Sequence, residues 1–566
     1  MGMPLENIIE TDVLVIGGGL AGCFASVKAK EKGAEVILAD KGYVSKTGGT
    51  PYAGDTMVFN PEWGHDLDAW MEQVSVLGEY VNNRQWNEIV FKESFDRFKD
   101  LESFGVKFME ENGEVVRLPH PMSTLDLPDK DKFPPLVSQV VHWLPGWAAA
   151  IRKHVEKSGV RLMERVVICE LIEQDDKIVG AIGFPVDKEE LIVFKAKAVV
   201  ICAGGGGFRP VGYPTHELTA DGASMAYRVG AEITGKEFVG PSTSRGFEPH
   251  PGWKTMYEVF SSGHSAALPG EAKKTPFLGR LVNSEGDEVL RRGMSWHGWI
   301  DVHYEMHAGR GPLYTEGPGG RKMPVGGPGA GGSMHGHATA GIFPSDTDCS
   351  VGVPGLYGAG DSLGVQFVGA TYSGFGFATA YASVSGARAG TAAAEFALKT
   401  GVVSLDQAKV ENMEKSIKGP MERKGGFSPR WVTEVLRSYM LPYFVMYIKH
   451  EDRLKAALMN VEFIRDHLVP KLTARDAHEL RLAHETRSMV LNAEMKLRSS
   501  MFRKESRGNH YREDFPQRND PDWFAWVMLK QENGKMQVYK KPMPEEWWPD
   551  MTKSYNERYP LKFPEN

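Results

Sequence analysis

The 566-residue chain has few cysteines and no apolar run suited to crossing a membrane. Its cysteines are Cys23, Cys169, Cys202 and Cys349, which lie far apart and form no C-x-x-C pair. This spacing argues against a disulfide framework, a metal site or an iron–sulfur cluster held by this chain alone. The most apolar long run, residues 431–448, is interrupted by charged residues and a proline, which favours buried helices over a membrane span.

The sequence also lacks an excess of positive charge and a targeting segment. The net charge of −7 disfavours nucleic acids and anionic membrane surfaces as partners. The first residues, MGMPLENIIETD, are acidic and show no basic segment followed by an apolar one, so we expect a cytoplasmic protein that is not membrane-spanning. A chain of this length is expected to form two to four domains.

The clearest pattern lies near the start, in TDVLVIGGGLAGCFASVKAKEKGAEVILAD. An apolar run typical of a buried parallel strand leads into Gly17, Gly19 and Gly22, which have G-x-G-x-x-G spacing. Glycines there allow a pyrophosphate to approach the start of the following helix. Asp40 ends the second strand, where its carboxylate can accept hydrogen bonds from a ribose hydroxyl. The complete order of these parts predicts a dinucleotide site.

Two later segments repeat the junction between a buried strand and glycines. They are KAVVICAGGGG at residues 197–207 and GLYGAGDS at residues 355–362, and a helix of small residues follows the second. Between them, Asp221 opens another helix, either as its N-cap or as a group facing a ribityl or phosphate hydroxyl. Three such junctions predict one extended cofactor across the carboxyl ends of one sheet, and FAD fits that length.

These motifs resemble those of the succinate dehydrogenase and fumarate reductase flavoprotein superfamily, and the chain is similar also to the adenylylsulfate reductase α-subunit. The resemblance rests on GGGLAG, ICAGG, TADGASMAYRVGAEITGKEF, YEMHAGRGPLY, GLYGAGDS and ESRGNHYREDFPQRNDPDW, in the family's order. It implies an α/β fold with a Rossmann-like FAD-binding domain in two parts, residues 1–240 and 333–403. An α+β capping domain for the substrate is inserted at 241–332, and a helical domain, 404–500, and a C-terminal arm, 501–566, follow. The helical domain is also predicted by the periodicity of its sequence.

The resemblance further implies which residues contact FAD. Carried over by position, they are Gly17, Gly19, Ala21, Gly22, Asp40, Lys41, Thr47, Gly48, Gly49, Ala203, Gly204, Asp221, Asp361, Gly376 and Phe377. In the membrane-complex relatives, a histidine after the second strand carries FAD covalently. Residues 43–57 contain no histidine here, so we expect non-covalent FAD.

The substrate side departs from the family. Reduction of fumarate needs cations for two carboxylates and, in the family, an arginine that delivers a proton. Ser295 and Trp296 stand where that arginine is expected, and Thr371 and Tyr372 stand where a second arginine belongs. These replacements predict a substrate larger or less charged than fumarate. Tyr372 becomes a candidate site residue, although aromatic residues at such positions more often serve packing.

Histidine is the remaining candidate for proton transfer. The segment SMHGHATAGI at 333–342 lies where the family has a substrate-binding histidine, and either His335 or His337 aligns with it. Histidine suits a general acid or base because its ordinary pKa is near neutrality. A loop histidine bonded to the backbone is the alternative, whereas a metal site lacks a third ligand at suitable spacing. His297 is a weaker candidate.

We therefore expect an FAD-dependent oxidoreductase that transfers hydride between flavin N5 and an activated C–C or C=C bond of a small-molecule substrate. Two alternatives stay open. One is a flavoprotein subunit like that of adenylylsulfate reductase, acting on a sulfur centre with an iron–sulfur partner. The other is an FAD-carrying electron-transfer subunit without its own substrate. An electron-transfer partner and a homo-oligomer are both compatible with the sequence.

Overall fold

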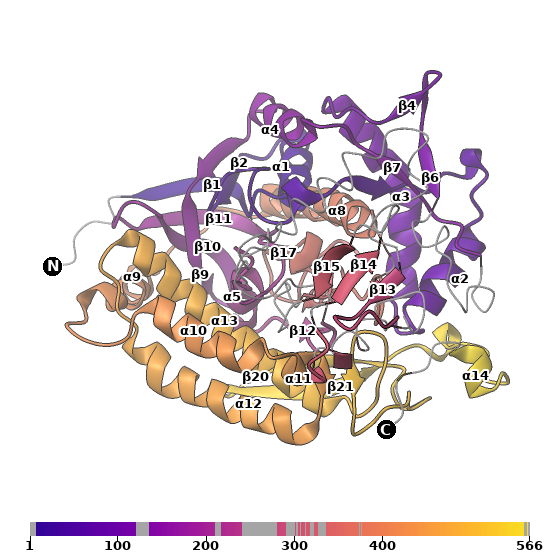
Figure 1. The fold of residues 1–566 in the computed structure, drawn as a ribbon. Helices are drawn as coiled ribbons and strands as arrows, with labels where there is room; N and C mark the ends of the chain where they lie inside the picture. Colours follow the sequence, from indigo (N-terminus) through magenta and orange to yellow (C-terminus); the bar gives the residue numbers. More distant parts are fainter. Residues whose placement is uncertain are drawn as a thin grey trace.

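The structure, a computed structural model, shows an α/β architecture in which helices cover a central sheet (Figure 1). The residues that it describes are 7–119, 135–209, 217–239, 280–289, 300, 304–305, 307–311, 313–316, 322–326, 335–372, 374, 376–559 and 563. None of the helices in these ranges combines the length and the apolar character that a bilayer span requires.

The central sheet has seven strands and brings three strand ends to one edge. Its strands are β1 (Ile8–Ile16), β2 (Val36–Asp40), β8 (Arg161–Glu164), β9 (Val166–Gln174), β10 (Lys177–Pro185), β11 (Ile192–Ile201) and β17 (Leu356–Gly358). The order is β8-β2-β1-β11-β10-β9, and β17 also pairs with β11. Because β1, β11 and β17 run parallel, their carboxyl ends meet, so the three glycine junctions lie at one edge of one sheet, as predicted.

Small residues let two helices approach closely on this sheet. The helices nearest the strand ends are α1 (Leu20–Glu31), α4 (Trp147–Lys157), α5 (Asp221–Arg228) and α8 (Phe377–Lys399). A Cβ atom on Gly386 of α8 would lie 2.4 Å from the Ala21 carbonyl oxygen, and one on Gly390 would lie 2.1 Å from that of Ala25. The small-residue composition of α8 is therefore required by its contact with α1.

A second, smaller sheet and two helices flank the central sheet. The strands are β3 (Asp55–Met57), β6 (Arg117–Pro119) and β7 (Gln139–His142), and the helices are α2 (Leu67–Leu77) and α3 (Arg84–Ser103). The order β3-β7-β6 is antiparallel throughout. A short hairpin of β4 (Glu110–Glu111) and β5 (Glu114–Val115) lies beside it. This sheet supplies one wall of the cavity described below.

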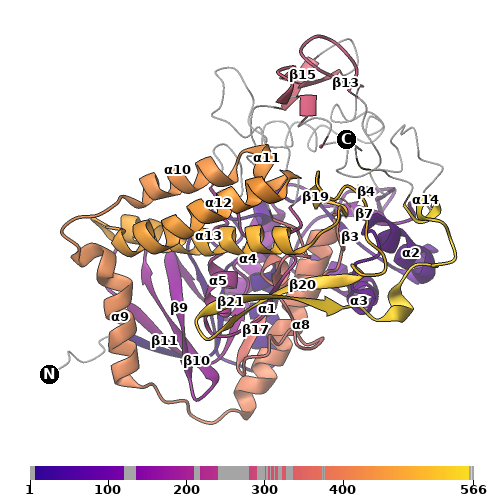
Figure 2. The ribbon, with the colours of Figure 1, turned by 90° about the horizontal axis from the view of Figure 1, so that it is seen from below.

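Part of the predicted capping domain is a three-stranded antiparallel sheet. It consists of β13 (Arg280–Val282), β14 (Leu313–Glu316) and β15 (Lys322–Gly326), in that order. In Figure 2, β13 and β15 lie on the opposite side of the helices α10 and α12 from the hairpin β20–β21. Most of residues 241–332 lie outside the described residues.

In the predicted helical domain, α10, α12 and α13 run along one another, and α9 runs across them at one end (Figure 2). The helices of this domain are α9 (Gln407–Glu422), α10 (Pro429–Met440), α11 (Tyr443–Met446), α12 (Glu451–Phe463) and α13 (Ala477–Phe502). Helix α13 continues two residues past the predicted boundary at residue 500. Buried side chains of α13 face α5, which connects this domain to the cofactor side of the molecule.

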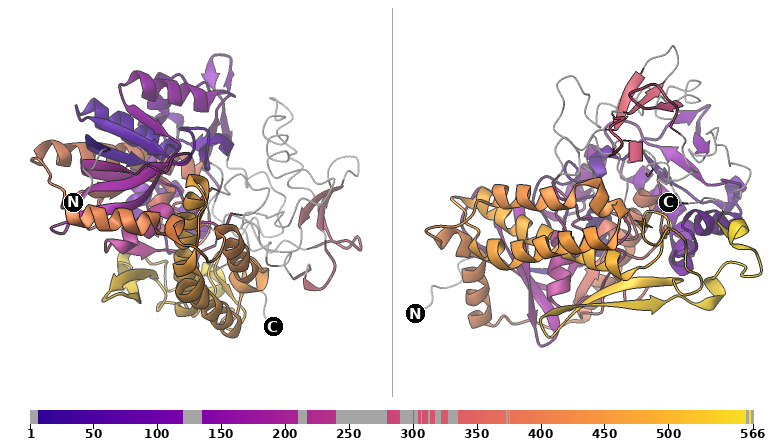
Figure 3. Two further views of the ribbon diagram at one scale, coloured as in Figure 1. Left: turned by 90° about the vertical axis from the view of Figure 1, so that its left-hand side faces the viewer. Right: turned by 60° about the horizontal axis from the view of Figure 1, so that its bottom comes forward.

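The predicted C-terminal arm is built into a sheet. Its hairpin, β20 (Ala525–Glu532) and β21 (Lys535–Pro542), runs along the underside of the molecule in Figure 3. Strand β20 pairs with β12 (Ile233–Thr234), which pairs with β16 (Gly341–Ile342). The remaining β-strands and α-helix of the described residues are β18 (Ile448–Lys449), β19 (Tyr511–Arg512) and α14 (Tyr555–Arg558). The last part of the chain therefore joins strands that precede and follow the capping segment.

Candidate functional site

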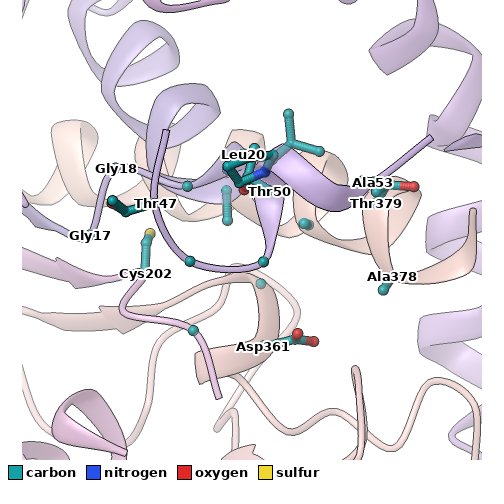
Figure 4. Close-up of a pocket in the computed structure, with 18 of the residues that line it drawn as sticks. Gly17, Gly18, Leu20, Thr47, Thr50, Ala53, Cys202, Asp361, Ala378 and Thr379 are labelled. Atoms are coloured by element: carbon teal, nitrogen blue, oxygen red, sulfur yellow. The ribbon is translucent and has the colours of Figure 1, made fainter. Parts of the chain in front are cut away.

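A large cavity lies where the carboxyl ends of β1, β11 and β17 meet. Its volume is about 840 Å³, within the range of small-molecule and cofactor sites. The walls come from the start of α1, the end of β2, residues 47–55, residues 142–147 and the start of α8. In Figure 4, Gly17 and Thr47 lie at one side of this central cavity, and Ala53, Ala378 and Thr379 lie at the other. The cavity is therefore long enough to connect the glycine turn with the start of α8.

The glycine turn after β1 forms a tight backbone cradle. Gly17 has a φ of +105°, and a Cβ atom there would lie 2.4 Å from the Cys202 carbonyl oxygen. A Cβ atom on Gly22 would lie 1.8 Å from the Gly17 carbonyl oxygen, so only glycine allows α1 to start this close to the strand. The first turn of α1 has no side-chain cap, apart from a hydrogen bond of 2.9 Å from the Leu20 N–H to Thr50 Oγ1. Such a helix start is suited to a phosphate.

Asp40 holds the glycine turn in place. Its Oδ2 accepts a hydrogen bond of 2.6 Å from the Gly18 N–H, and its Oδ1 accepts one of 2.6 Å from the Gly42 N–H. The carboxylate lines the cavity at the end of β2, where the sequence places it. Its hydrogen bond to a ribose stays a prediction.

Lys41 connects the cavity wall to a buried carboxylate of the helical domain. Its Nζ lies 2.8 Å from Asp221 Oδ2 and 2.9 Å from Glu485 Oε1. Burial raises the pKa of Asp221, but the charge and hydrogen bond of Lys41 outweigh burial and keep that pKa below its usual range. The interpretation of Asp221 as an N-cap is wrong, because the N-cap of α5 is Ala220 and it makes no side-chain cap.

Most of the residues predicted to contact FAD surround this one cavity. Those that line it are Gly17, Gly19, Ala21, Asp40, Lys41, Thr47, Gly48, Gly49, Ala203, Gly204, Asp221, Asp361 and Gly376. Gly22 lies behind the cavity wall, in the packing of α1 described above. Phe377 does not line the cavity either; its buried ring lies 5.9 Å from that of Phe367. A dinucleotide lying from the glycine turn to the start of α8 fits this cradle.

The two candidate histidines have different places. His337 lines the cavity, and its Nδ1 lies 2.7 Å from Asp361 Oδ2. The other oxygen, Asp361 Oδ1, accepts a hydrogen bond of 3.0 Å from the Ala338 N–H. Burial lowers the pKa of His337, but the charge and hydrogen bond of Asp361 outweigh it and raise that pKa above the usual value. Asp361 in turn has a pKa well below its usual range.

His335 lies behind this pair. It is 2% exposed, does not line the cavity, and accepts a hydrogen bond of 3.4 Å at Nδ1 from the Gly206 N–H. Its Nε2 is 3.9 Å from Asp361 Oδ1. Burial lowers the pKa of His335 to about 3, so this ring is neutral. The sequence left the two histidines equivalent, and the structure gives the cavity position to His337.

The third candidate, Tyr372, also lines the cavity. Its ring centroid is 5.3 Å from that of His337, and its hydroxyl accepts a hydrogen bond of 3.1 Å from the Ala378 N–H at the start of α8. Burial raises the pKa of Tyr372 well above its usual value, so the hydroxyl stays protonated. His297 lies outside the described residues.

Asp55 and His142 were not predicted as site residues, yet both line the cavity. They stand opposite each other in the antiparallel pairing of β3 and β7. The small residues next to Asp55 indicate a segment near a flat ligand, but no motif marks the acid itself. Among the described residues, no cluster of three histidine, cysteine or acidic side chains is placed to hold a metal ion.

Comparisons with known proteins agree with this geometry. Residues 12–240 match the family described as FAD binding domain, and residues 434–555 match the family described as fumarate reductase flavoprotein C-term. The chain is 27% identical to one subunit of the fumarate reductase (CoM/CoB) of Methanothermobacter marburgensis, over 94% of this chain and 98% of that protein.

Two solved structures have the same fold. The quinol fumarate reductase FrdA of E. coli, in a mutant form, superposes with a TM-score of 0.75 at 17% identity, over 95% of this chain and 97% of that one. The adenylylsulfate reductase of Archaeoglobus fulgidus superposes with a TM-score of 0.72 at 21% identity, over 95% and 96% of the two chains. At these identities the likeness concerns the fold.

Proposed function

We propose that this chain, an FAD-dependent oxidoreductase with segments that match the FAD binding domain and the fumarate reductase flavoprotein C-term families, acts on an activated C–C or C=C bond. The substrate of this proposal is larger or less charged than fumarate. FAD, when bound, exchanges hydride at N5 with a carbon of that bond. The glycine turn, Asp40, Lys41 and Asp361 are the residues that would hold FAD along the cavity.

The observation that carries the proposal is the pair of His337 and Asp361 on the cavity wall. The raised pKa of His337 increases the fraction of its ring that is imidazolium, and this form can donate a proton to the substrate carbon next to the one that receives hydride. In the reverse direction, the neutral ring accepts that proton. Asp361 orients the ring through Nδ1, which leaves Nε2 for the substrate.

The charge of the cavity supports a substrate other than a small dicarboxylate. Among the described lining residues, Lys41 is the single lysine or arginine, and its charge is already matched by Asp221 and Glu485. A pair of cations that would bind two carboxylates is therefore not provided by the described walls. Thr371 and Tyr372, which stand where the family has a second substrate arginine, also favour a substrate other than a small dicarboxylate.

We also propose that FAD is bound without a covalent link, because residues 43–57 contain no histidine. The four cysteines are free and buried. Electrons from an iron–sulfur centre would therefore have to come from a second chain, and the relative from Methanothermobacter marburgensis is itself named as a subunit. We accordingly propose an electron-transfer partner.

The test is single-turnover reoxidation of the reduced holoenzyme without oxygen. The acceptors are fumarate, larger aryl or cyclic enoates, and adenylylsulfate. We expect one enoate to restore the oxidised spectrum and to yield the saturated product. His337→Asn should slow this step by about 10²- to 10⁴-fold, whereas the matched His335→Asn should slow it far less, because His335 does not line the cavity.

Other outcomes contradict the proposal. Reoxidation by adenylylsulfate would replace it with chemistry at a sulfur centre. A flavin that no acceptor reoxidises would indicate an electron-transfer subunit, and equal effects of the two histidine variants would remove the role of His337.

A further inference from the structure

A carboxyl group with no hydrogen-bonding partner among the described residues lines the central cavity. Asp55 is the first residue of β3, and its side chain is half-buried in the cavity wall. Its backbone carbonyl accepts a hydrogen bond of 2.8 Å from Thr379 Oγ1, which fixes the strand against α8. Within the described part of the chain, its carboxyl oxygens accept no hydrogen bond and form no ion pair. A carboxylate in such a place costs free energy unless it is protonated.

The groups around Asp55 do not neutralise its charge. His142 stands opposite it on β7 and also lines the cavity, and burial lowers the pKa of His142, which favours a neutral ring. The hydroxyl of Tyr372 stays protonated, and its pKa is raised further by the charges of Asp55 and Asp361. The first charged side chain of α8 is Arg388, three turns from the start of the helix. Burial consequently raises the pKa of Asp55 to about 7.

Asp55 belongs to the end of the cavity that the flavin ring must occupy. The glycine turn and Asp40 suit the pyrophosphate and the adenosine ribose, so the flavin half extends away from them. In Figure 4, Ala53, Ala378 and Thr379 lie at the side of the cavity away from Gly17 and Thr47. Asp55 is two residues from Ala53, and its backbone carbonyl accepts the hydrogen bond of Thr379. Its carboxyl, which lines the cavity, would thus lie beside the flavin ring when FAD is bound.

We propose that Asp55 binds a proton whenever the bound flavin is reduced, and so sets the pH dependence of the flavin midpoint potential. Reduction by two electrons places one proton on flavin N5 and leaves one negative charge on the ring. That charge raises the proton affinity of a carboxylate beside it, so Asp55 changes from COO⁻ to COOH. In the range where Asp55 is ionised beside the oxidised flavin, reduction thus takes up two protons for two electrons. Where it is already protonated, reduction takes up one.

The test measures the holoenzyme without any substrate, so its result is independent of the substrate class proposed above. The flavin midpoint potential is recorded from pH 6 to 9 by reductive titration with dithionite and reference dyes. Above about pH 7, we expect a steeper dependence on pH in the wild type than in Asp55→Asn, with a difference of one proton per two electrons. Asp55→Glu keeps the carboxyl and should keep the steep slope.

Matched controls separate Asp55 from other groups at the site. Glu110 lines the same cavity but is exposed, and Glu110→Gln should leave the slope unchanged. His337 also lines the cavity and has a pKa raised by Asp361, so the effect of Asp55→Asn must persist when it is combined with His337→Asn. Equal slopes in the wild type and Asp55→Asn overturn the proposal.

A second measurement covers the case in which Asp55→Asn fails to fold or to retain FAD. Proton uptake by the weakly buffered wild-type holoenzyme is followed with a pH indicator during reduction at pH 8. We expect uptake of more than one proton per flavin at this pH, and uptake of a single proton contradicts the proposal whatever the variants do.

Discussion

Replacing Asp361 by asparagine tests whether this residue sets the proton affinity of His337. The carboxylate lies 2.7 Å from His337 Nδ1, and two unit charges at that separation attract by about 6 kcal/mol at an effective dielectric constant of about 20. The actual stabilisation of the imidazolium is smaller, because the His337 side chain is 36% exposed to solvent and because burial lowers the pKa that the charge of Asp361 raises. An opposite charge at this range typically shifts a pKa by about 1–3 units, or about 1.4–4 kcal/mol. Asparagine can still accept the hydrogen bond of the Ala338 N–H, so the change is mainly one of charge.

The expected result is a pKa of His337 that falls by about 1–3 units, and below its ordinary value, because burial then acts unopposed. It is measured by NMR titration of histidine-labelled holoenzyme, with His337→Asn assigning the resonance. In single-turnover reduction of the acceptor, the wild-type rate should be lost as pH rises through the raised pKa. In Asp361→Asn that loss should begin at lower pH, so that the rate above both pKa values falls by about 10- to 1,000-fold.

A control and a refuting result complete this test. Asp348→Asn removes an acidic group whose side chain is 70% exposed, and it should leave the titration of His337 unchanged. An unaltered pKa of His337 in Asp361→Asn would refute the reasoning, and so would an alkaline limb that stays in place.

Two further substitutions test the cavity wall. Gly22→Ala should abolish FAD retention or folding, measured as the flavin-to-protein absorbance ratio, because its Cβ would lie 1.8 Å from the Gly17 carbonyl oxygen. Lys41→Met should destabilise the FAD-free protein by about 3–5 kcal/mol in urea unfolding, because it leaves Glu485, 1% exposed, without this cation. Lys32→Met is the matched control for the second substitution; its ion pair is exposed on both sides, so the expected cost is about 1 kcal/mol or less.

The glycine substitution has its own control. Gly401 has open space around its Cβ position, and Gly401→Ala should bind FAD normally. Normal FAD content in Gly22→Ala would show that the turn can rearrange. A loss of stability in Lys41→Met no larger than that in Lys32→Met would show that Arg209 and Arg481, which also contact Glu485, suffice.

The parts of the fold that the sequence predicts are those determined by local patterns. Apolar strands that lead into glycines indicate both the parallel sheet and the edge at which the cavity forms, as β1, β11 and β17 show. The helices from α9 to α13 follow from their periodicity. The sequence could not show that His337, rather than His335, lines the cavity. The two histidines belong to one turn, and only the directions of their side chains distinguish them.

Contacts between distant segments explain what the sequence did not show. Asp55 and His142 meet through the register of two short strands, and no motif spans their separation. The partner of Lys41 on α13 is 444 residues away. Asp221 is a similar case. Its position at the start of α5 suggested an N-cap, but its carboxylate forms an ion pair with Lys41.

The pairing of β20 with β12 bears on the order in which the protein is completed during synthesis. Strand β12 ends at Thr234 and β16 begins at Gly341, so these two strands enclose the capping segment in the chain. The strand that pairs with the other edge of β12, β20, starts only at Ala525. Until β20 has been synthesised, β12 therefore lacks this partner and presents an open strand edge. This sheet can be completed only after the chain between β12 and β20 has been made, which separates its completion in time from the formation of the strands before it.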